Sequence, residues 1–178
     1  MTPSTLRRLA FATLAASLVP APLAAQQADL SAFETGPVFE DFGPHAPVPG
    51  ADVSPLDRYQ IAFDVAAPKG EAARNRGFES AARFINMHVA AGVREDWIDI
   101  AVVVHGRAVM DLVAGKGDAN EAMVRAMLAR GVRFIVCGQS AAAYGVTGDD
   151  LIDGVEMDLS AMTAHALLQQ AGYTVNPF

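Results

Sequence analysis

Apolar residues from position 59 onward follow two alternating patterns, one typical of buried strands and one typical of amphipathic helices. Residues 98–106, IDIAVVVHG, form an almost unbroken β-branched run, as expected for a strand covered on both faces. Residues 132–138, VRFIVCG, repeat that pattern. Residues 59–66, YQIAFDVA, are also rich in strand formers, and Pro68 and Gly70 follow them as strand terminators. The pattern therefore predicts three strands in the middle of the chain.

Three longer segments have helical periodicity instead. In residues 77–92, the side chains of Phe78, Ala82 and Ile85 share one face when they are placed at 100° per residue. A second helix is expected from an N-cap at residue 118 to a terminating glycine at residue 131. Residue 160, a serine, is the expected N-cap of a third helix that runs to about residue 171.

The remaining segments fit the same alternation. A helical turn is expected near residues 108–113, a short helix at 140–144, and further strands at 154–160 and 173–178. Strands that alternate with helices and read as continuous apolar runs form parallel sheets between helix layers. The sequence therefore predicts an α/β fold with three layers, α/β/α, and a mainly parallel sheet of about five strands, flavodoxin-like in size.

The N-terminal third has a different composition. Arg7 and Arg8 precede an apolar run that is too short to span a bilayer, and small residues follow it up to Ala25. These features are typical of a secretory signal peptide. We therefore expect residues 1–25 to be a signal peptide that directs export to a bacterial periplasm. Residues 26–57 are rich in proline, which predicts an irregular arm on the surface of an α/β domain at residues 58–178.

The net charge limits the partners of the protein. The formal charge is −7, and removal of two arginines with the signal peptide takes it to −9. A chain this acidic, without a basic run, is not expected to bind nucleic acid or an anionic membrane. The four histidines have no metal-ligand spacing, and no dinucleotide-binding glycine motif follows the first strand. We therefore expect no metal and no cofactor.

Cys137 is the only cysteine, which is unusual for an exported protein. It lies where the predicted strand at 132–138 meets the start of a helix, and ligands of parallel sheets bind at such carboxyl ends. Backbone N–H groups and the helix dipole at that point favour a thiolate. Gly138 allows a sharp turn, and Gln139 and Ser140 carry hydrogen-bond donors. The alternative is a cysteine that is simply packed in the core.

His105 occupies the equivalent position after the neighbouring strand, and Gly106 follows it as a second tight turn. An imidazole at this point could pair with the thiolate or transfer protons near neutral pH. It could equally be a histidine that is hydrogen-bonded at a strand end.

The motifs VVVHGRAV, ANEAMVRAMLARGVRFIVCGQSAAAYG, GVEMDLSAMTA and QQAGY together resemble the DsrE/DsrF-like family, in its exported branch. This resemblance implies a three-layer subunit that forms homo-oligomers, commonly trimers or hexamers. It implies that Cys137 carries sulfur as a persulfide and exchanges it with a sulfur donor or acceptor protein. The expected catalytic residues are Cys137, by this resemblance, and His105, by its position after the neighbouring strand; the resemblance also places His105 in the pocket.

The same resemblance implies a set of residues that line the substrate pocket: Gly106, Gly138, Gln139, Ser140, Asn86 and Asn120. The chain departs from the cytoplasmic sulfur-relay members because it carries an export signal, so their partners do not transfer to it. Two hypotheses follow. The first is an exported persulfide carrier or sulfurtransferase-like subunit, and the second is a non-catalytic oligomeric binding or assembly protein with Cys137 buried. A third alternative is a redox sensor whose Cys137 thiols form a disulfide between subunits.

Overall fold

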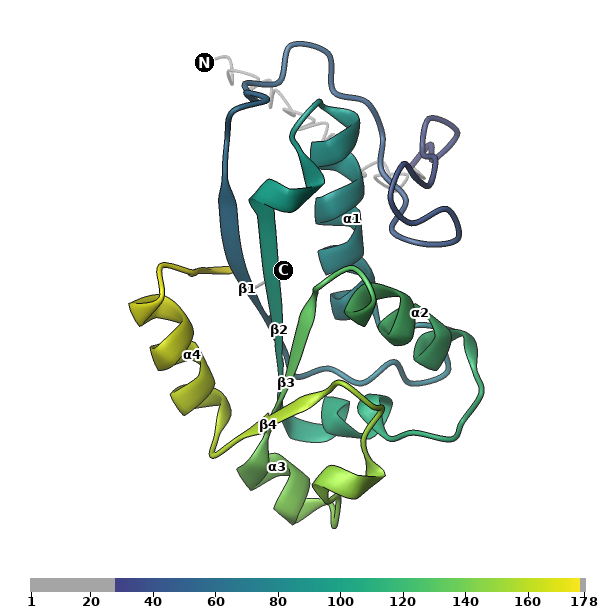
Figure 1. Cartoon of the computed structure of the whole chain (residues 1–178). Helices are drawn as coiled ribbons and strands as arrows, with labels where there is room; N and C mark the ends of the chain where they lie inside the picture. The colour runs from purple at the N-terminus through teal and green to yellow at the C-terminus, as the bar shows by residue number, and fades with distance from the viewer. Residues whose placement is uncertain (1–27, 177–178) are drawn as a thin grey trace, which may run out of the picture.

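The computed structural model describes residues 28–176, so the expected signal peptide lies outside the described residues. Five strands form one sheet in the order β4-β3-β2-β1-β5, and all neighbouring strands are parallel (Figure 1). The strands are β1 (Tyr59–Val65), β2 (Ile98–Val104), β3 (Arg133–Cys137), β4 (Glu156–Asp158) and β5 (Thr174–Asn176). The predicted α/β fold with a sheet of about five strands is confirmed.

Helices cover the two faces of the sheet unequally. The α-helices are α1 (Arg76–Ala90), α2 (Ala119–Leu128), α3 (Gly138–Ala143) and α4 (Ala161–Gln170). Three short 3-10 helices complete the described elements: η1 (Glu95–Trp97), η2 (Gly106–Leu112) and η3 (Gly148–Asp150). Helices α1 and α2 lie on one side of the sheet, and α4 lies alone on the other (Figure 1).

Four elements differ from the sequence prediction in their bounds. Strands β4 and β5 are only three residues long because each is an edge strand, paired on one side over three positions. Helix α3 begins at Gly138 rather than Ser140, since Cys137 has extended backbone angles and takes the N-cap position. The turn expected at residues 108–113 is η2, which starts earlier, directly after the strand-terminal His105.

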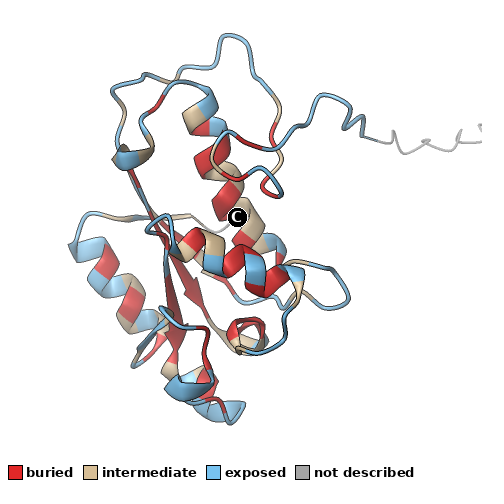
Figure 2. Cartoon of the chain, turned by 45° about the vertical axis from the view of Figure 1, so that its right-hand side comes forward, coloured by how far each residue is buried: buried red, intermediate tan, exposed pale blue. Residues whose placement is uncertain are grey.

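The core is divided by the sheet into a large and a small part (Figure 2). The large part lies under α1 and α2 and includes Phe63, Phe78 and Phe134, each at most 2% exposed. The small part lies under α4 and consists of the buried residues Ala62, Ala101, Val103, Ile135, Ala164 and Leu168. Alternation along the strands therefore assigns each strand residue to the α1–α2 face or to the α4 face.

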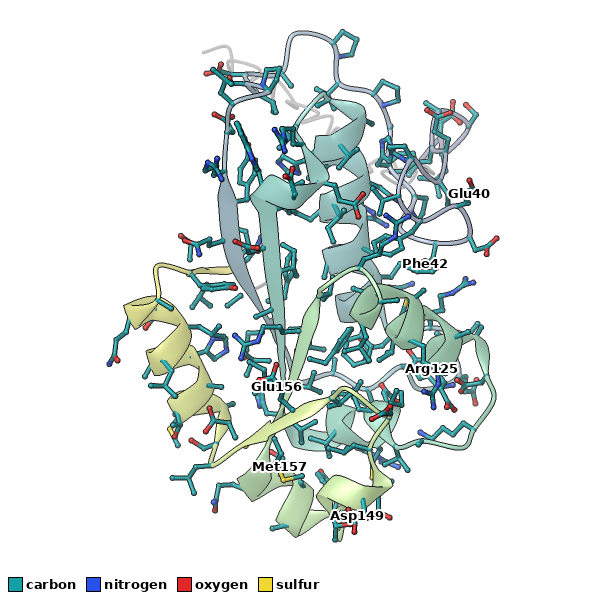
Figure 3. All side chains as sticks on the ribbon, viewed as in Figure 1. Glu40, Phe42, Arg125, Asp149, Glu156 and Met157 are labelled. Carbon is teal, nitrogen blue, oxygen red and sulfur yellow. The ribbon has the colours of Figure 1, made fainter. Side chains whose placement is uncertain are left out.

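The N-terminal arm, residues 28–57, lies against α1. Phe39 and Phe42 of the arm stack on each other at 4.8 Å and join the large core (Figure 3 labels Phe42). Gly43 approaches α1 so closely that an added Cβ would lie 2.8 Å from the backbone nitrogen of Arg83. The arm is therefore packed as part of the domain, against the middle of α1.

Candidate functional site

Cys137 is the last residue of β3 and the N-cap of α3. Val136 belongs to the large core and Ile135 to the small core, so the alternation of the strand places Cys137 on the α4 face. Space around the next residue is limited, since a Cβ on Gly138 would lie 2.7 Å from the carbonyl oxygen of Asp158. Glycine at this position therefore permits β4 to approach the start of α3.

The thiol of Cys137 is surrounded by hydrogen-bond donors from two helices. Burial of the thiol raises its pKa, but the Ser140 hydroxyl and the backbone N–H groups of Ser140, Ala161 and Gln139 outweigh that effect. The net result is a pKa below the ordinary cysteine value. Ala161 is the first residue of α4, so N–H groups from the starts of both α3 and α4 help to lower the pKa of the thiol. This arrangement stabilises a thiolate.

Ser140 links the thiol to the neighbouring strand. Its Oγ accepts a hydrogen bond of 2.9 Å from the backbone N–H of Gly106. The hydroxyl hydrogen is thereby free to point at Cys137, which matches its contribution to the thiol pKa. Gly106 has a φ of +56°, a conformation that favours glycine, and this turn presents its N–H to Ser140. Three of the predicted site residues, Cys137, Ser140 and Gly106, are therefore connected in one small network.

A second group of side chains lies on the same face of the sheet. His105 follows β2, and its Nε2 lies 3.2 Å and 3.3 Å from the two carboxylate oxygens of Asp64 on β1. The Nε2 of His165 on α4 lies 2.8 Å from Asp64 Oδ1. Burial raises the pKa of Asp64, but hydrogen bonds and positive charge from His165 and His105 lower it overall. One carboxylate thus joins two histidines that are 60 positions apart in the sequence.

This carboxylate–histidine cluster lies next to Cys137. The register pairs Val104 with Val136, so His105 and Cys137 are the next residues on adjacent parallel strands. Both lie on the α4 face by alternation. His165 is four residues after Ala161, so it lies one turn further along the same side of α4. The geometry therefore brings a thiol and two imidazoles to one edge of the sheet.

Sequence patterns identified His105 but not Asp64 or His165. Asp64 interrupts an apolar strand one residue before its end, and this polar residue at the carboxyl end of β1 was an available signal. His165 lies on the inner side of α4 between Ala164 and Leu168, which are buried. Neither residue is near His105 in the sequence, so only the order of the strands and the path of α4 brings the three together.

The other predicted site residues have different surroundings. The Gln139 side chain is exposed and donates to the carbonyl oxygen of Leu159 at 3.2 Å. The buried Asn86 amide binds the arm, accepting from the N–H groups of Val38 and Phe39 and donating to three arm carbonyls. Its hydrogen bonds therefore hold the arm and are not made to the thiol.

Asn120 belongs to a buried network behind the β1–α1 loop. Its Oδ1 accepts from the backbone N–H of Asn75, and its amide donates to the carbonyl of Asp111. The Asp111 carboxylate accepts in turn from Asn75 and from the backbone N–H of Lys69. This network fixes the loop that follows Asp64, so Asn120 contributes to the site through that loop.

A cavity of about 260 Å³ opens beside this loop, at the carboxyl end of β1. Asp64, Ala66, Lys69 and Arg76 are among the residues that line it. Two larger cavities, of about 420 Å³ and 530 Å³, lie at the amino ends of β1 and β2, at the opposite edge of the sheet. In parallel sheets ligands bind at the carboxyl ends, so the smaller cavity lies at the same edge of the sheet as Cys137 and His105, although neither residue lines it.

Two kinds of site are not found in the part of the chain that the structure describes. No group of three histidine, cysteine, aspartate or glutamate side chains in residues 28–176 is arranged to hold a metal ion. No helix among these residues is both long enough and apolar enough to span a membrane.

The family model of the DsrE/DsrF-like family matches residues 60–177, which is most of the chain. The chain belongs to the DsrE/DsrF-like family. The resemblance inferred from the motifs around His105 and Cys137 is thereby confirmed. No curated protein matches the chain significantly.

Solved structures of similar fold are also found. A protein of unknown function from Methanobacterium thermoautotrophicum, MTH1491, is 21% identical and superimposes with a TM-score of 0.53, over 67% of this chain and 99% of that one. The ychN protein of E. coli is 20% identical, with a TM-score of 0.46 over 68% of this chain and all of its own. The first of these similarities supports the fold and says nothing of activity.

Proposed function

We propose that the protein is an exported persulfide carrier, or sulfurtransferase-like subunit, in which Cys137 binds the transferred sulfur. One observation carries the proposal: the donors of α3, α4 and Ser140 converge on the sulfur and lower the pKa of the thiol. A thiolate is the nucleophilic form of cysteine. Donors in this arrangement also stabilise the anion that remains after sulfur leaves.

Loading of the carrier is a simple displacement. The Cys137 thiolate attacks the outer sulfur of a sulfane donor such as thiosulfate or polysulfide. A bond forms between Sγ and that sulfur, the sulfur–sulfur bond of the donor breaks, and the electron pair leaves with the donor fragment. With thiosulfate the leaving group is sulfite, and no external oxidant or reductant is consumed. The partner in the cell would be a sulfur donor or acceptor protein.

A second function competes with the first. Cys137 is only 6% exposed, as expected of a packed thiol. In a non-catalytic binding or assembly protein, this cysteine would be part of the small core and would not react in the folded state. The two functions differ in the reactivity of the thiol before unfolding.

Intact mass spectrometry separates the two. The purified protein is incubated with polysulfide or thiosulfate and analysed with and without a reductant. A carrier gains one or more sulfur atoms in a reductant-sensitive form, and Cys137→Ser gains none while keeping the wild-type circular dichroism spectrum. If the wild type gains no sulfur and its thiol reacts with an alkylating reagent only after unfolding, the binding or assembly function stands instead.

Export and self-association are further parts of the proposal. Export is supported by the sequence of residues 1–25, and N-terminal sequencing of protein recovered from the periplasm tests for cleavage after Ala25. Self-association is supported by the outer surface of α4, where Met162 is 80% exposed and Leu167 is 54% exposed.

A further inference from the structure

The carboxylate–histidine cluster, Asp64 with His105 and His165, has no role in the loading step described above. It is built from three elements that are distant in the sequence: β1, the end of β2, and α4. Buried or half-buried charged groups are costly to assemble, so a cluster of this kind at a strand edge calls for a functional explanation.

We propose that this cluster is the proton acceptor for sulfur release, in which His105 takes the proton of an incoming thiol and Asp64 positions its ring. The proposal rests on the proposed function, because it concerns the second half of the same sulfur transfer. The acceptor is defined by its chemistry as a thiol that arrives protonated at neutral pH.

The hydrogen bonds indicate which histidine reacts. His165 points Nε2 at Asp64, and its Nδ1 is buried without a hydrogen-bond partner. A proton on that Nδ1 would be buried with no acceptor, which is costly. His165 is therefore best suited to donate Nε2–H to Asp64 and to hold the carboxylate in place. The His105 side chain is 33% exposed, so its ring is the one that can reach an acceptor and return a proton to water.

The position of His105 also fits this role. It is adjacent to Cys137 across β2 and β3, and the next residue, Gly106, binds the Ser140 that contacts the thiol. Asp64 in turn lines the cavity of about 260 Å³, which therefore borders the cluster through this carboxylate, although His105 and Cys137 are not among its lining residues. Lys69 and Arg76 line the same cavity and add positive charge. Asp158 on β4 is the register partner of Cys137 on β3, so it is the nearest acidic residue on that neighbouring strand.

The release step balances without a further reagent. The acceptor R–SH gives its proton to His105, and its sulfur attacks the outer sulfur of the Cys137 persulfide. A bond forms between the two sulfur atoms, and the bond from that outer sulfur to Sγ breaks. The electron pair leaves with Sγ as a thiolate, which the donors of α3 and α4 hold. The acceptor departs as a persulfide, and His105 later releases its proton to solvent.

The test compares release to two classes of acceptor. Wild type, Asp64→Asn and His105→Gln are loaded with polysulfide, and loading is checked by mass. Loss of the extra sulfur is then followed at neutral pH with a small alkyl monothiol, which arrives protonated, or with an electron-poor aromatic thiol, which arrives ionised. Asp99→Asn is the matched control, since it makes the same change on the same face of the sheet at the other end of β2.

General-base catalysis predicts a difference that depends on the acceptor. With the alkyl thiol, release from His105→Gln falls roughly a hundredfold and release from Asp64→Asn roughly tenfold or more. With the ionised aromatic thiol, both variants match the wild type, because no proton has to be removed. Imidazole in solution restores release to the alkyl thiol in His105→Ala. Asp99→Asn behaves as the wild type throughout.

Two other results would overturn the proposal in distinguishable ways. If the wild type loads but the variants release sulfur at the wild-type rate to both thiols, or are slowed equally with both, the cluster has no proton-transfer role and the persulfide function survives. If the wild type gains no sulfur at all, the proposed function falls and this inference falls with it. His105 is partly exposed, so His105→Gln provides the test even if Asp64→Asn fails to fold.

Discussion

At the scale of single residues, the lowered pKa of the Cys137 thiol depends on a few hydrogen-bond donors. Among these, the Ser140 hydroxyl is the one supplied by a side chain and can be removed without changing the backbone. Its orientation is set by the hydrogen bond it accepts from the N–H of Gly106. The turn at Gly106 therefore helps to orient a hydrogen-bond donor toward the thiol on the next strand.

Replacing Ser140 with alanine should raise the pKa of Cys137, because the thiolate loses a donor while the thiol does not. A hydrogen bond to a charged group contributes about 1.5–3 kcal/mol. The rate of alkylation at neutral pH should therefore fall roughly tenfold. A profile of alkylation rate against pH measures this directly, and the curve should move to higher pH. Thiolate reactivity is lost as the pH falls through the pKa of the thiol, and the depressed pKa of the wild type places that loss at lower pH than in Ser140→Ala.

Ser80→Ala is the control for this experiment, because Ser80 lies on α1 on the other side of the sheet. Its alkylation profile should superimpose on that of the wild type. An unchanged profile in Ser140→Ala would mean that the backbone N–H groups alone set the pKa of the thiol.

The position of a residue at a strand end could be predicted from sequence where a single segment contained the pattern. Cys137 and His105 each follow a strand that reads as a continuous apolar run, so their place at the carboxyl edge could be inferred. Asp64 and His165 could not be paired in this way. Their contact depends on the crossing of α4 from β4 at one edge of the sheet to β5 at the other, and no local pattern records that path.

At the scale of elements, the arm and α1 are joined by one buried amide. Asn86 is fully buried, and it accepts two N–H groups and donates to the carbonyls of Phe39, Phe42 and Gly43. The family resemblance implies that Asn86 lines the substrate pocket. Its hydrogen bonds to the arm replace the regular backbone pairing that a proline-rich arm does not make.

Removing this amide should loosen the arm and destabilise the domain. Asn86→Ala leaves buried N–H and carbonyl groups without partners, which should reduce the free energy of unfolding by about 2–4 kcal/mol. Chemical denaturation measures this loss. Hydrogen exchange of the Val38 and Phe39 amides should accelerate more than that of the β2 amides, because the arm opens before the sheet.

Met87→Ala on the same helix is the matched control, since Met87 is 39% exposed and should cost much less stability. Equal effects of the two substitutions would show that Asn86 acts only as a packed side chain. The sulfur-loading assay provides a second control. Because the contacts of Asn86 serve the arm, Asn86→Ala should still load sulfur at a temperature where it is folded.

The elements themselves were largely predictable, and the reasons are physical. β1, β2 and β3 are buried on both faces, so burial alone gives them an apolar pattern. β4 and β5 carry few buried residues, and their length is set by how far they pair with a neighbour. The start of α3 was placed two residues late because the expected cap was a serine, while the backbone turns at Cys137.

At the scale of the whole molecule, the surface of α4 differs from the rest of the protein. The ten residues of this helix include no aspartate, glutamate, lysine or arginine. Its outer side is exposed and carries Met162 and Leu167, and Leu159 precedes it at 69% exposure (Figure 2). An exposed helix without charge is unusual for a surface that faces only water.

We propose that a second copy of the chain is the partner of this surface. The chain has a net charge of −7, so two copies repel each other over most of their surfaces. An uncharged apolar helix is where they can approach without that repulsion. α4 is also the only helix on its side of the sheet in the described chain, so an interface there would cover the small core and the edge of the thiol site.

Substitution of Met162 and Leu167 by glutamate should therefore abolish self-association. Size-exclusion chromatography with light scattering should give an oligomer for the wild type and a monomer for the double variant, with an unchanged circular dichroism spectrum. Leu56→Glu, at a residue 76% exposed on the arm, should remain oligomeric because only the α4 surface is required. A wild type that is monomeric at high concentration would show that the α4 surface does not bind a second copy of the chain. An oligomeric double variant would place the interface elsewhere, for example at the edge of β4, where Met157 is 42% exposed (Figure 3).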